Sequence, residues 1–164
     1  MSLEYFTIMN KAIVIFACIF SMCVKPPEHV AVSDKSVEAF AQTIKESNLS
    51  VLAVGGFYLH SKVEKLYLDL KYKGTLSKDE AKQKLTSYVK GMVEHINHDP
   101  ALLPHLIKES FDYADISISL GYTSLEGKSS QVHLYNNEIV FSTYHSHNNS
   151  LEKDFTEPFF GQEI

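Results

Sequence analysis

The sequence contains no arginine and no tryptophan, and all 15 of its basic residues are lysine. Arginine provides the planar fork that binds a phosphate group or a guanine edge through two hydrogen bonds at once. Its absence, together with the net charge of −5, argues against a protein that binds nucleic acid. Both cysteines, Cys18 and Cys23, precede residue 24, so the rest of the chain has no cysteine for a disulfide, a thiol nucleophile or a metal site.

Several common catalytic motifs are also missing. The sequence has no GxxxxGK[ST] phosphate loop, no GxGxxG dinucleotide motif and no GxSxG nucleophile turn. The Gly55-Gly56 pair lacks the lysine and hydroxyl residue of a phosphate loop, and we interpret it as a tight turn or a point of close packing. We therefore expect no cofactor, and no motif identifies an enzymatic reaction.

A short apolar run near the N-terminus bears on where the protein resides. The 13 residues from Ala12 to Val24 are too few to span a bilayer, which needs roughly 20. A lysine precedes the run and small or polar residues end it, which is typical of a secretion signal. We expect residues 1–23 to be a signal peptide or lipoprotein leader, with translation starting at Met1 or Met9. The two prolines that follow predict a linker over residues 24–32.

The sequence leaves two ways in which this leader is processed. Cys23 stands where a bacterial lipoprotein carries its lipid, and the proline segment would then tether the domain to the membrane. The neighbours Phe20 and Met22 replace the leucine and the small residue that usually precede such a cysteine. Plain cleavage near Val24 is the alternative. Both outcomes predict an exported protein, either periplasmic or anchored to the membrane through a lipid.

Residues 33–164 are expected to form a single α+β domain. Ser77 and Glu80 form the Ser-x-x-Glu pattern of a capping box, and an apolar stripe follows it. This pattern predicts an amphipathic helix from about Lys78 to Asn97. A shorter amphipathic helix is expected before it, starting near Ser33, Asp34 or Ser36.

Alternating apolar and polar residues predict strands over 62–72, 115–122 and 131–145, with residues 49–59 forming a strand or a turn that leads into one. The last segment is expected to be a hairpin about Asn136-Asn137. A two-residue turn there pairs Leu134 with Ile139 and Val132 with Phe141, and places all four on one face. The chain from Ser146 onward has the composition of a polar tail. We predict an antiparallel sheet of about four strands with two amphipathic helices packed on one face.

The segments TLSKDEAKQKL, INHDPALLPHL, SFDYADISISLGY, EIVFSTY and LEKDFTEPFF resemble a group of small bacterial proteins of unassigned function. The group is mostly exported or lipoprotein-like, and the resemblance covers most of the chain after about Leu49. Lys82 and Leu103 stand where the group often has arginine, so a site built on those arginines would be absent here. The resemblance implies export and a shared topology, and it implies no activity.

Histidines provide a candidate metal site. His145 and His147 are two residues apart at the end of a predicted strand, and His133 lies on the neighbouring strand. Three protein ligands and one open position are what a catalytic zinc ion requires. The alternative is that these histidines are exposed and without function. His95 and His98 fall in the last turn of the long helix, where a positive charge is favourable.

Two tyrosines point to a binding surface, because Tyr67 and Tyr135 fall on the polar faces of their strands. Cross-strand packing would also explain them. We predict a small, non-enzymatic protein of the bacterial envelope that binds a protein or another ligand, unidentified by the sequence, through its sheet face or loops. The alternative is a metal-dependent hydrolase or metal-binding protein using His133, His145 and His147. A third hypothesis is an interaction subunit that pairs through a strand edge.

Overall fold

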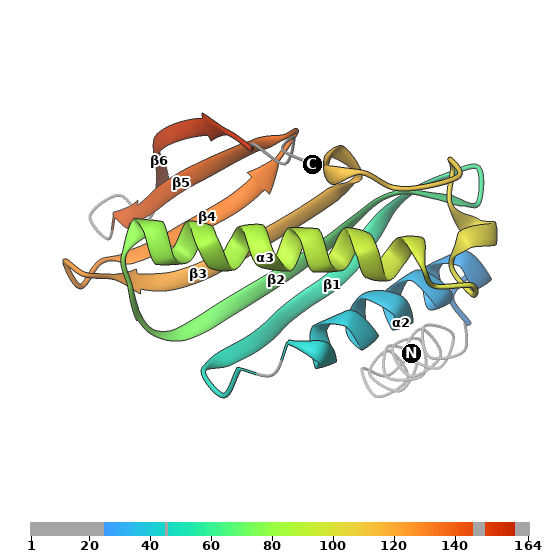
Figure 1. Cartoon of the computed structure of the whole chain (residues 1–164), viewed down its shortest axis with the longest axis horizontal. Coiled ribbons are helices and arrows are strands. Elements are labelled where there is room, and N and C mark those ends of the chain that lie inside the picture. The colour runs from blue at the N-terminus through green and yellow to red at the C-terminus, as the bar shows by residue number, and fades with distance from the viewer. Residues whose placement is uncertain (1–24, 45, 146–149, 160–164) are drawn as a thin grey trace, which may run out of the picture.

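The computed structural model describes residues 25–44, 46–145 and 150–159. Within these residues the fold is α+β, and two α-helices lie on one face of a six-stranded sheet (Figure 1). The strands lie side by side in the order in which they follow along the chain. The elements are α2 (Glu28–Thr43), β1 (Leu49–Leu59), β2 (Lys62–Leu76), α3 (Lys78–Asn97), β3 (Ile116–Ser124), β4 (Ser129–Tyr135), β5 (Glu138–His145) and β6 (Ser150–Pro158), with short 3-10 turns at Leu103–His105 and Tyr113–Asp115.

The sheet has six strands, so the prediction of about four was too low. Residues 49–59 form a complete strand, and the stretch after Ser146 that was interpreted as a polar tail contains β6. β6 is an edge strand with charged residues near its centre, as is common where a sheet edge must avoid aggregation. One of its few apolar side chains, Phe155, stacks on Phe141 of β5 with ring centroids 4.6 Å apart. A strand with so little alternation gives a weak sequence signal.

The sheet is also not entirely antiparallel. β2 and β3 run parallel, with Leu66 beside Ile116 and Leu70 beside Leu120. A parallel pair needs a long crossover connection, and α3 is part of the crossover that joins these two strands. The other four neighbouring pairs of strands are antiparallel.

The predicted hairpin is confirmed in its turn and in its register. β4 and β5 are joined at Asn136 and Asn137, whose φ angles are 49° and 62°. Asparagine tolerates these left-handed conformations better than most residues, and two of them in succession suit a tight hairpin turn. The predicted partners are paired, and all four of their side chains are buried: Leu134 with Ile139, and Val132 with Phe141.

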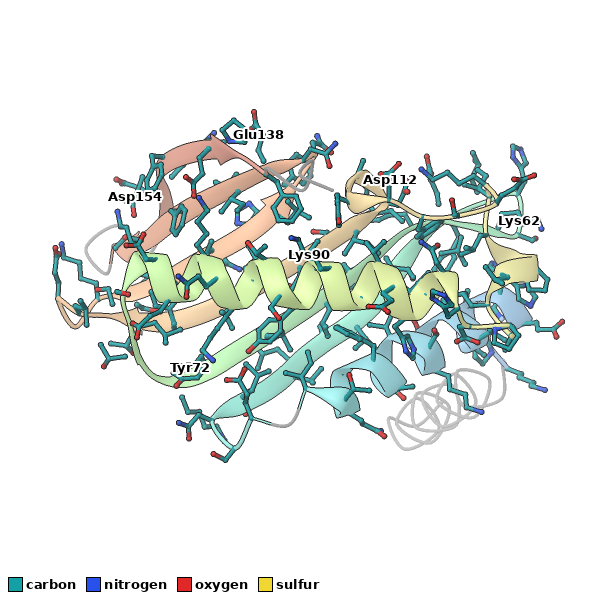
Figure 2. The ribbon with its side chains drawn as sticks, viewed as in Figure 1. Lys62, Tyr72, Lys90, Asp112, Glu138 and Asp154 are labelled. Atoms are coloured by element: carbon teal, nitrogen blue, oxygen red, sulfur yellow. The ribbon has the colours of Figure 1, made fainter. Side chains whose placement is uncertain are left out.

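The long helix is confirmed, because α3 spans Lys78–Asn97. Ser77 caps its first turn: the Glu80 N–H donates to Ser77 Oγ at 3.2 Å, and the Ser77 N–H donates to Glu80 Oε2 at 2.8 Å. This is the reciprocal capping box that the sequence predicted. The exposed side of the helix carries Lys90 (Figure 2). The opposite side is buried against the sheet through Ala81, Leu85, Tyr88, Val89, Met92 and Ile96.

The first described helix starts earlier than expected. α2 begins at Glu28, so the predicted linker over residues 24–32 is helical from that residue onward. Pro27 precedes the first helical residue, where a missing backbone N–H costs no helical hydrogen bond. Its carbonyl accepts hydrogen bonds from the N–H groups of Val30 and Ala31 at 3.0 and 3.1 Å. The proposed leader, residues 1–23, lies outside the described residues, so the division into leader and domain stays a prediction.

Candidate functional site

One face of the sheet is not covered by α2 or α3. On β2, Leu66, Leu68 and Leu70 are buried in the core beneath the helices, and side chains alternate along a strand. Tyr67 and Asp69 therefore point to the other side. We call this surface the open face and define it by Phe57 of β1, Lys65, Tyr67 and Asp69 of β2, Ser117 and Ser119 of β3, and His133 and Tyr135 of β4.

Tyr67 lies across the neighbouring strand because Gly55 leaves room for it. A Cβ atom on Gly55 would come within 2.4 Å of the Tyr67 hydroxyl and 2.6 Å of Cζ. Gly55 and Tyr67 are register partners on β1 and β2, and the Phe57 ring lies 6.4 Å from the Tyr67 ring. The Gly55-Gly56 pair is thus a point of close packing within a strand, one of the two interpretations that the sequence left open. This close packing positions the Tyr67 side chain next to Phe57.

Tyr135 occupies the far end of the open face, just before the β4–β5 turn. Its side chain is 56% exposed, and the Lys65 Nζ atom lies 5.7 Å from the centre of its ring. The same Lys65 ammonium donates to Asn136 Oδ1 at 3.4 Å. The contact between a cation and the face of the ring restricts the ring while leaving much of it exposed. Both predicted surface tyrosines, Tyr67 and Tyr135, therefore lie on the open face.

A polar row crosses the centre of this face on three neighbouring strands. Asp69 pairs in register with Ser119, and Ser119 pairs with His133. The Ser119 hydroxyl donates to Asp69 Oδ1 at 2.7 Å. Burial lowers the pKa of His133, and the charge of Lys153 lowers it further, while the charge of Asp69 acts in the opposite direction. The row thus provides a carboxylate, a hydroxyl and an imidazole that stays neutral to lower pH than usual.

The order of these contacts suits binding better than hydrolysis. A serine hydrolase triad needs the serine hydroxyl to donate to the histidine and the histidine to donate to the acid. Here Ser119 donates to the acid directly, and the described part of the chain shows no hydrogen bond from Ser119 to His133. The row can offer hydrogen bonds to a ligand that lies on the sheet.

The predicted metal ligands are only partly described. His133 lies on the open face, His147 lies outside the described residues, and of His145 only the backbone position in β5 is described. His145 is five residues along β5 from Val140, the register partner of His133, which is roughly 16 Å in a strand. Among the described residues no group of three His, Cys, Asp or Glu side chains could hold a metal ion. The three-histidine site stays a prediction.

The proposed lipid site also stays a prediction, because Cys23 lies outside the described residues. In the described ranges, no helix has both the length and the apolar composition needed to cross a bilayer.

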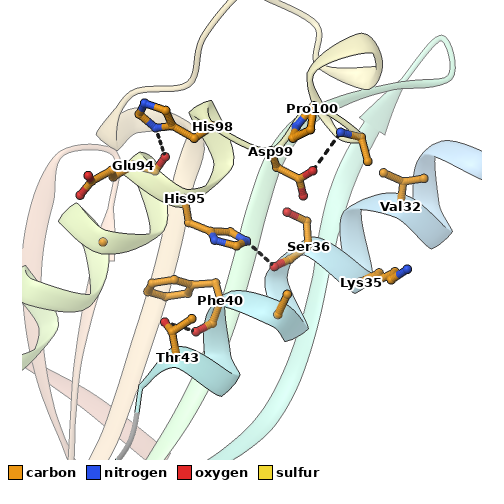
Figure 3. Close-up of a pocket in the computed structure, with 13 residues that line it drawn as sticks. Val32, Lys35, Ser36, Phe40, Thr43, Glu94, His95, His98, Asp99 and Pro100 are labelled. Carbon is orange, nitrogen blue, oxygen red and sulfur yellow. Dashed lines mark hydrogen bonds between the residues drawn. The ribbon is translucent and has the colours of Figure 1, made fainter.

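A groove separates α2 from the C-terminal half of α3 (Figure 3). Its volume is about 810 Å³, and apolar residues of α2, including Phe40, form one wall. His95 lies beside the Phe40 ring, and its Nε2 atom is 3.1 Å from the carbonyl oxygen of Ser36. His98 instead bonds back to its own helix, with Nδ1 2.8 Å from the carbonyl oxygen of Glu94. The two histidines point in different directions in Figure 3 and do not converge.

Asp99 closes one end of this groove. Its Oδ1 atom accepts a hydrogen bond from the Ala101 N–H at 2.9 Å. Burial alone would raise the pKa of Asp99, but the nearby Ser36 hydroxyl, hydrogen bonds from backbone N–H groups and the nearby charge of His95 hold it below the usual value. The carboxylate is therefore ionised across the neutral pH range.

Sequence reasoning did not find the groove. Two helices that are separated by a hairpin create it, and neither helix shows in its own pattern which residues meet across the gap. The signal that was present is Gly91, a residue without a side chain at the position where α3 packs against Phe40 of α2.

No family model, no curated protein and no solved structure matches this chain. The resemblance to small exported bacterial proteins therefore stays a prediction.

Proposed function

We propose that this protein is a non-enzymatic binding domain of the bacterial envelope, and that its open face binds a partner protein. The observation that carries this proposal is the exposure of aromatic side chains over a sheet surface that neither described helix covers. Phe57 is 60% exposed and Tyr135 is 56% exposed, with Tyr67 on a strand between them.

The chemistry of the open face supports a protein partner. Aromatic side chains are enriched at the centres of protein interfaces, because they bury a large area and lose little conformational entropy on binding. The Gly55 contact and the Lys65 contact restrict Tyr67 and Tyr135 before binding, which lowers that entropic cost further. The polar row provides hydrogen-bonding groups that fix the orientation of a partner.

Site-specific photo-crosslinking tests this proposal. A photoreactive phenylalanine analogue replaces Phe57 or Tyr135 in cells that naturally produce the protein. Matched controls carry the same analogue at Leu125, which is 73% exposed in the turn after β3, or at Lys90 on the outer side of α3. We expect one protein adduct of the same mass from both open-face positions and none from the controls. Equal crosslinking from the control positions, or none from the open face, would contradict the proposal.

The proposed location rests on the leader, and we propose that Cys23 is lipidated. Metabolic labelling with a palmitate analogue should mark the wild-type protein and leave Cys23→Ala unlabelled. Cys18→Ala is the matched control, because it removes the other cysteine of the same apolar run and should keep the label. A mature N-terminus at Val24 or beyond would show plain cleavage instead.

A further inference from the structure

The groove between α2 and α3 has the size and the walls of a small-molecule site, and it is separate from the open face. Its volume of about 810 Å³ falls within the usual range for such sites, which runs from roughly 300 to 1,000 Å³. Val32, Ala39 and Phe40 line it from α2. Gly91 of α3 faces Phe40 without a side chain, and a Cβ atom there would lie 3.2 Å from Phe40 Cε2. The missing side chain lets the Phe40 ring, which is only 5% exposed, pack closely against α3 at the floor of the groove.

One end of the groove is negative. Asp99 follows the C-terminus of α3, where the unpaired carbonyl groups of a helix add partial negative charge. In the part of the chain that the structure describes, no lysine forms an ion pair with Asp99. Lys35 lines the groove, but its amine points away from the carboxylate in Figure 3. Asp99 is thus an ionised carboxylate that pairs with no lysine in the described ranges, and the nearby charge of His95 helps to lower its pKa.

A second polar group lies at the same end. Ser36 is only 3% exposed, and its Oγ atom makes no hydrogen bond of good geometry with any described residue. The hydroxyl nevertheless faces Asp99 closely enough to lower the pKa of the carboxylate (Figure 3). A buried hydroxyl without a well-formed hydrogen bond is unfavourable, and a ligand that bonds to it removes this cost.

We propose that this groove binds a primary alkylammonium ion, a small amine with an apolar tail. The ammonium group donates hydrogen bonds to the Asp99 carboxylate and to Ser36 Oγ, and the tail packs on Phe40 and Ala39. A primary amine is required because a quaternary ammonium has no N–H group to donate. An alcohol of the same length lacks the charge that Asp99 attracts.

Titration of the ¹⁵N-labelled protein with four compounds of equal chain length tests this assignment. The compounds are hexylammonium, hexyltrimethylammonium, 1-hexanol and hexanoate, at pH 8, where histidine side chains are ordinarily neutral. Hexylammonium should shift the amide signals of Ser36, Phe40, Gly91 and Asp99, and should bind tightest of the four. Butane-1,4-diammonium, which has the charge but no apolar end, should bind more weakly than hexylammonium.

Two variants separate the charge from the shape of the site. Asp99→Asn keeps the acceptor for the Ala101 N–H but removes the charge, and should weaken hexylammonium binding about tenfold. The matched control is Asp79→Asn, the same substitution in the first turn of α3, which should leave the affinity unchanged. Ala39→Phe fills the groove from an exposed position of α2 and should abolish binding without touching the carboxylate.

The proposal is overturned if hexyltrimethylammonium, 1-hexanol or hexanoate binds as tightly as hexylammonium, or if none of the compounds shifts the groove signals. It is also overturned if Ala39→Phe binds hexylammonium as the wild type does, a result that remains informative even if Asp99→Asn fails to fold.

Discussion

Asn97 holds the connection between α3 and β3 in place, and its replacement by alanine should destabilise the protein strongly. Its side-chain amide donates to the carbonyl oxygen of Phe111 at 2.8 Å, and its Oδ1 atom accepts from the Phe111 N–H at 2.8 Å. Phe111 itself is 2% exposed and belongs to the core. One side chain at the end of the long helix therefore satisfies both backbone groups of a buried residue 14 positions later.

The expected loss of folding stability in Asn97→Ala follows from these two hydrogen bonds. A typical hydrogen bond contributes about 1 kcal/mol net, but a buried backbone group left without a partner costs about 1–3 kcal/mol. Asn97→Ala leaves two such groups, and both hydrogen bonds are only partly buried, so we expect a loss of about 2–4 kcal/mol. This is a large share of the roughly 5–15 kcal/mol that holds a typical domain folded.

Urea unfolding at pH 7, followed by circular dichroism, measures this loss. Asn97→Asp is a second variant, because it keeps the acceptor and replaces the donor with a charged oxygen beside the Phe111 carbonyl; it should be destabilised as well. Gln83→Ala, at an exposed position of the same helix, is the control and should change stability by less than about 0.5 kcal/mol. An Asn97→Ala protein as stable as this control would refute the reasoning.

Three further predictions concern the same helix and its contacts. Val89→Asp places an unpaired charge at a fully buried position and should abolish cooperative thermal unfolding; a normal melting curve would mean that the buried face of α3 is wrong. Ser77→Ala removes the helix cap and should cost about 1 kcal/mol in urea unfolding, and an unchanged midpoint would contradict that. Burial of Glu46 would raise its pKa, but hydrogen bonds from Lys84 and Tyr88 outweigh it and hold the pKa below the usual value. Glu46→Gln should therefore be less stable than wild type at pH 7, by about 1 kcal/mol, and the difference should shrink as the pH falls through the lowered pKa. A difference that persists at acidic pH would disprove this linkage.

Local signals in the sequence were sufficient for the long helix and the last hairpin. The capping residues Ser77 and Glu80 interact with each other within one turn, so the start of α3 depends on no distant contact. The Asn136-Asn137 turn sets its own register, and alternation on both strands agrees with it.

Other features depend on contacts between distant segments. β6 is held by the stacking of Phe155 on Phe141 and by an ion pair between Glu157 and Lys82 of α3, at 2.9 Å. Neither contact is visible in the pattern of β6 itself. The parallel pairing of β2 with β3 follows from the crossover through α3, whereas the polar alternating faces of both strands had suggested antiparallel neighbours.

The candidate sites also combine features that local sequence patterns predict with features that depend on contacts between distant segments. Alternation alone placed Tyr67 and Tyr135 on the polar face of the sheet, and the structure places both on the open face. The Gly55 contact beneath Tyr67 needed the register of β1 against β2. The α2–α3 groove needed the packing of two helices, and no pattern within either helix encodes that arrangement.

The affinity of a purified partner for an open-face double variant tests the central claim most directly. Phe57→Ser/Tyr135→Ser removes the two most exposed aromatic side chains of the open face and should leave the fold intact. Aromatic anchors at interface centres contribute about 2 kcal/mol or more each, so isothermal titration calorimetry should show at least a roughly 30-fold loss of affinity, the value for one such anchor. The surface control Leu125→Ser should bind as the wild type does. An unchanged affinity of the folded double variant would contradict the account.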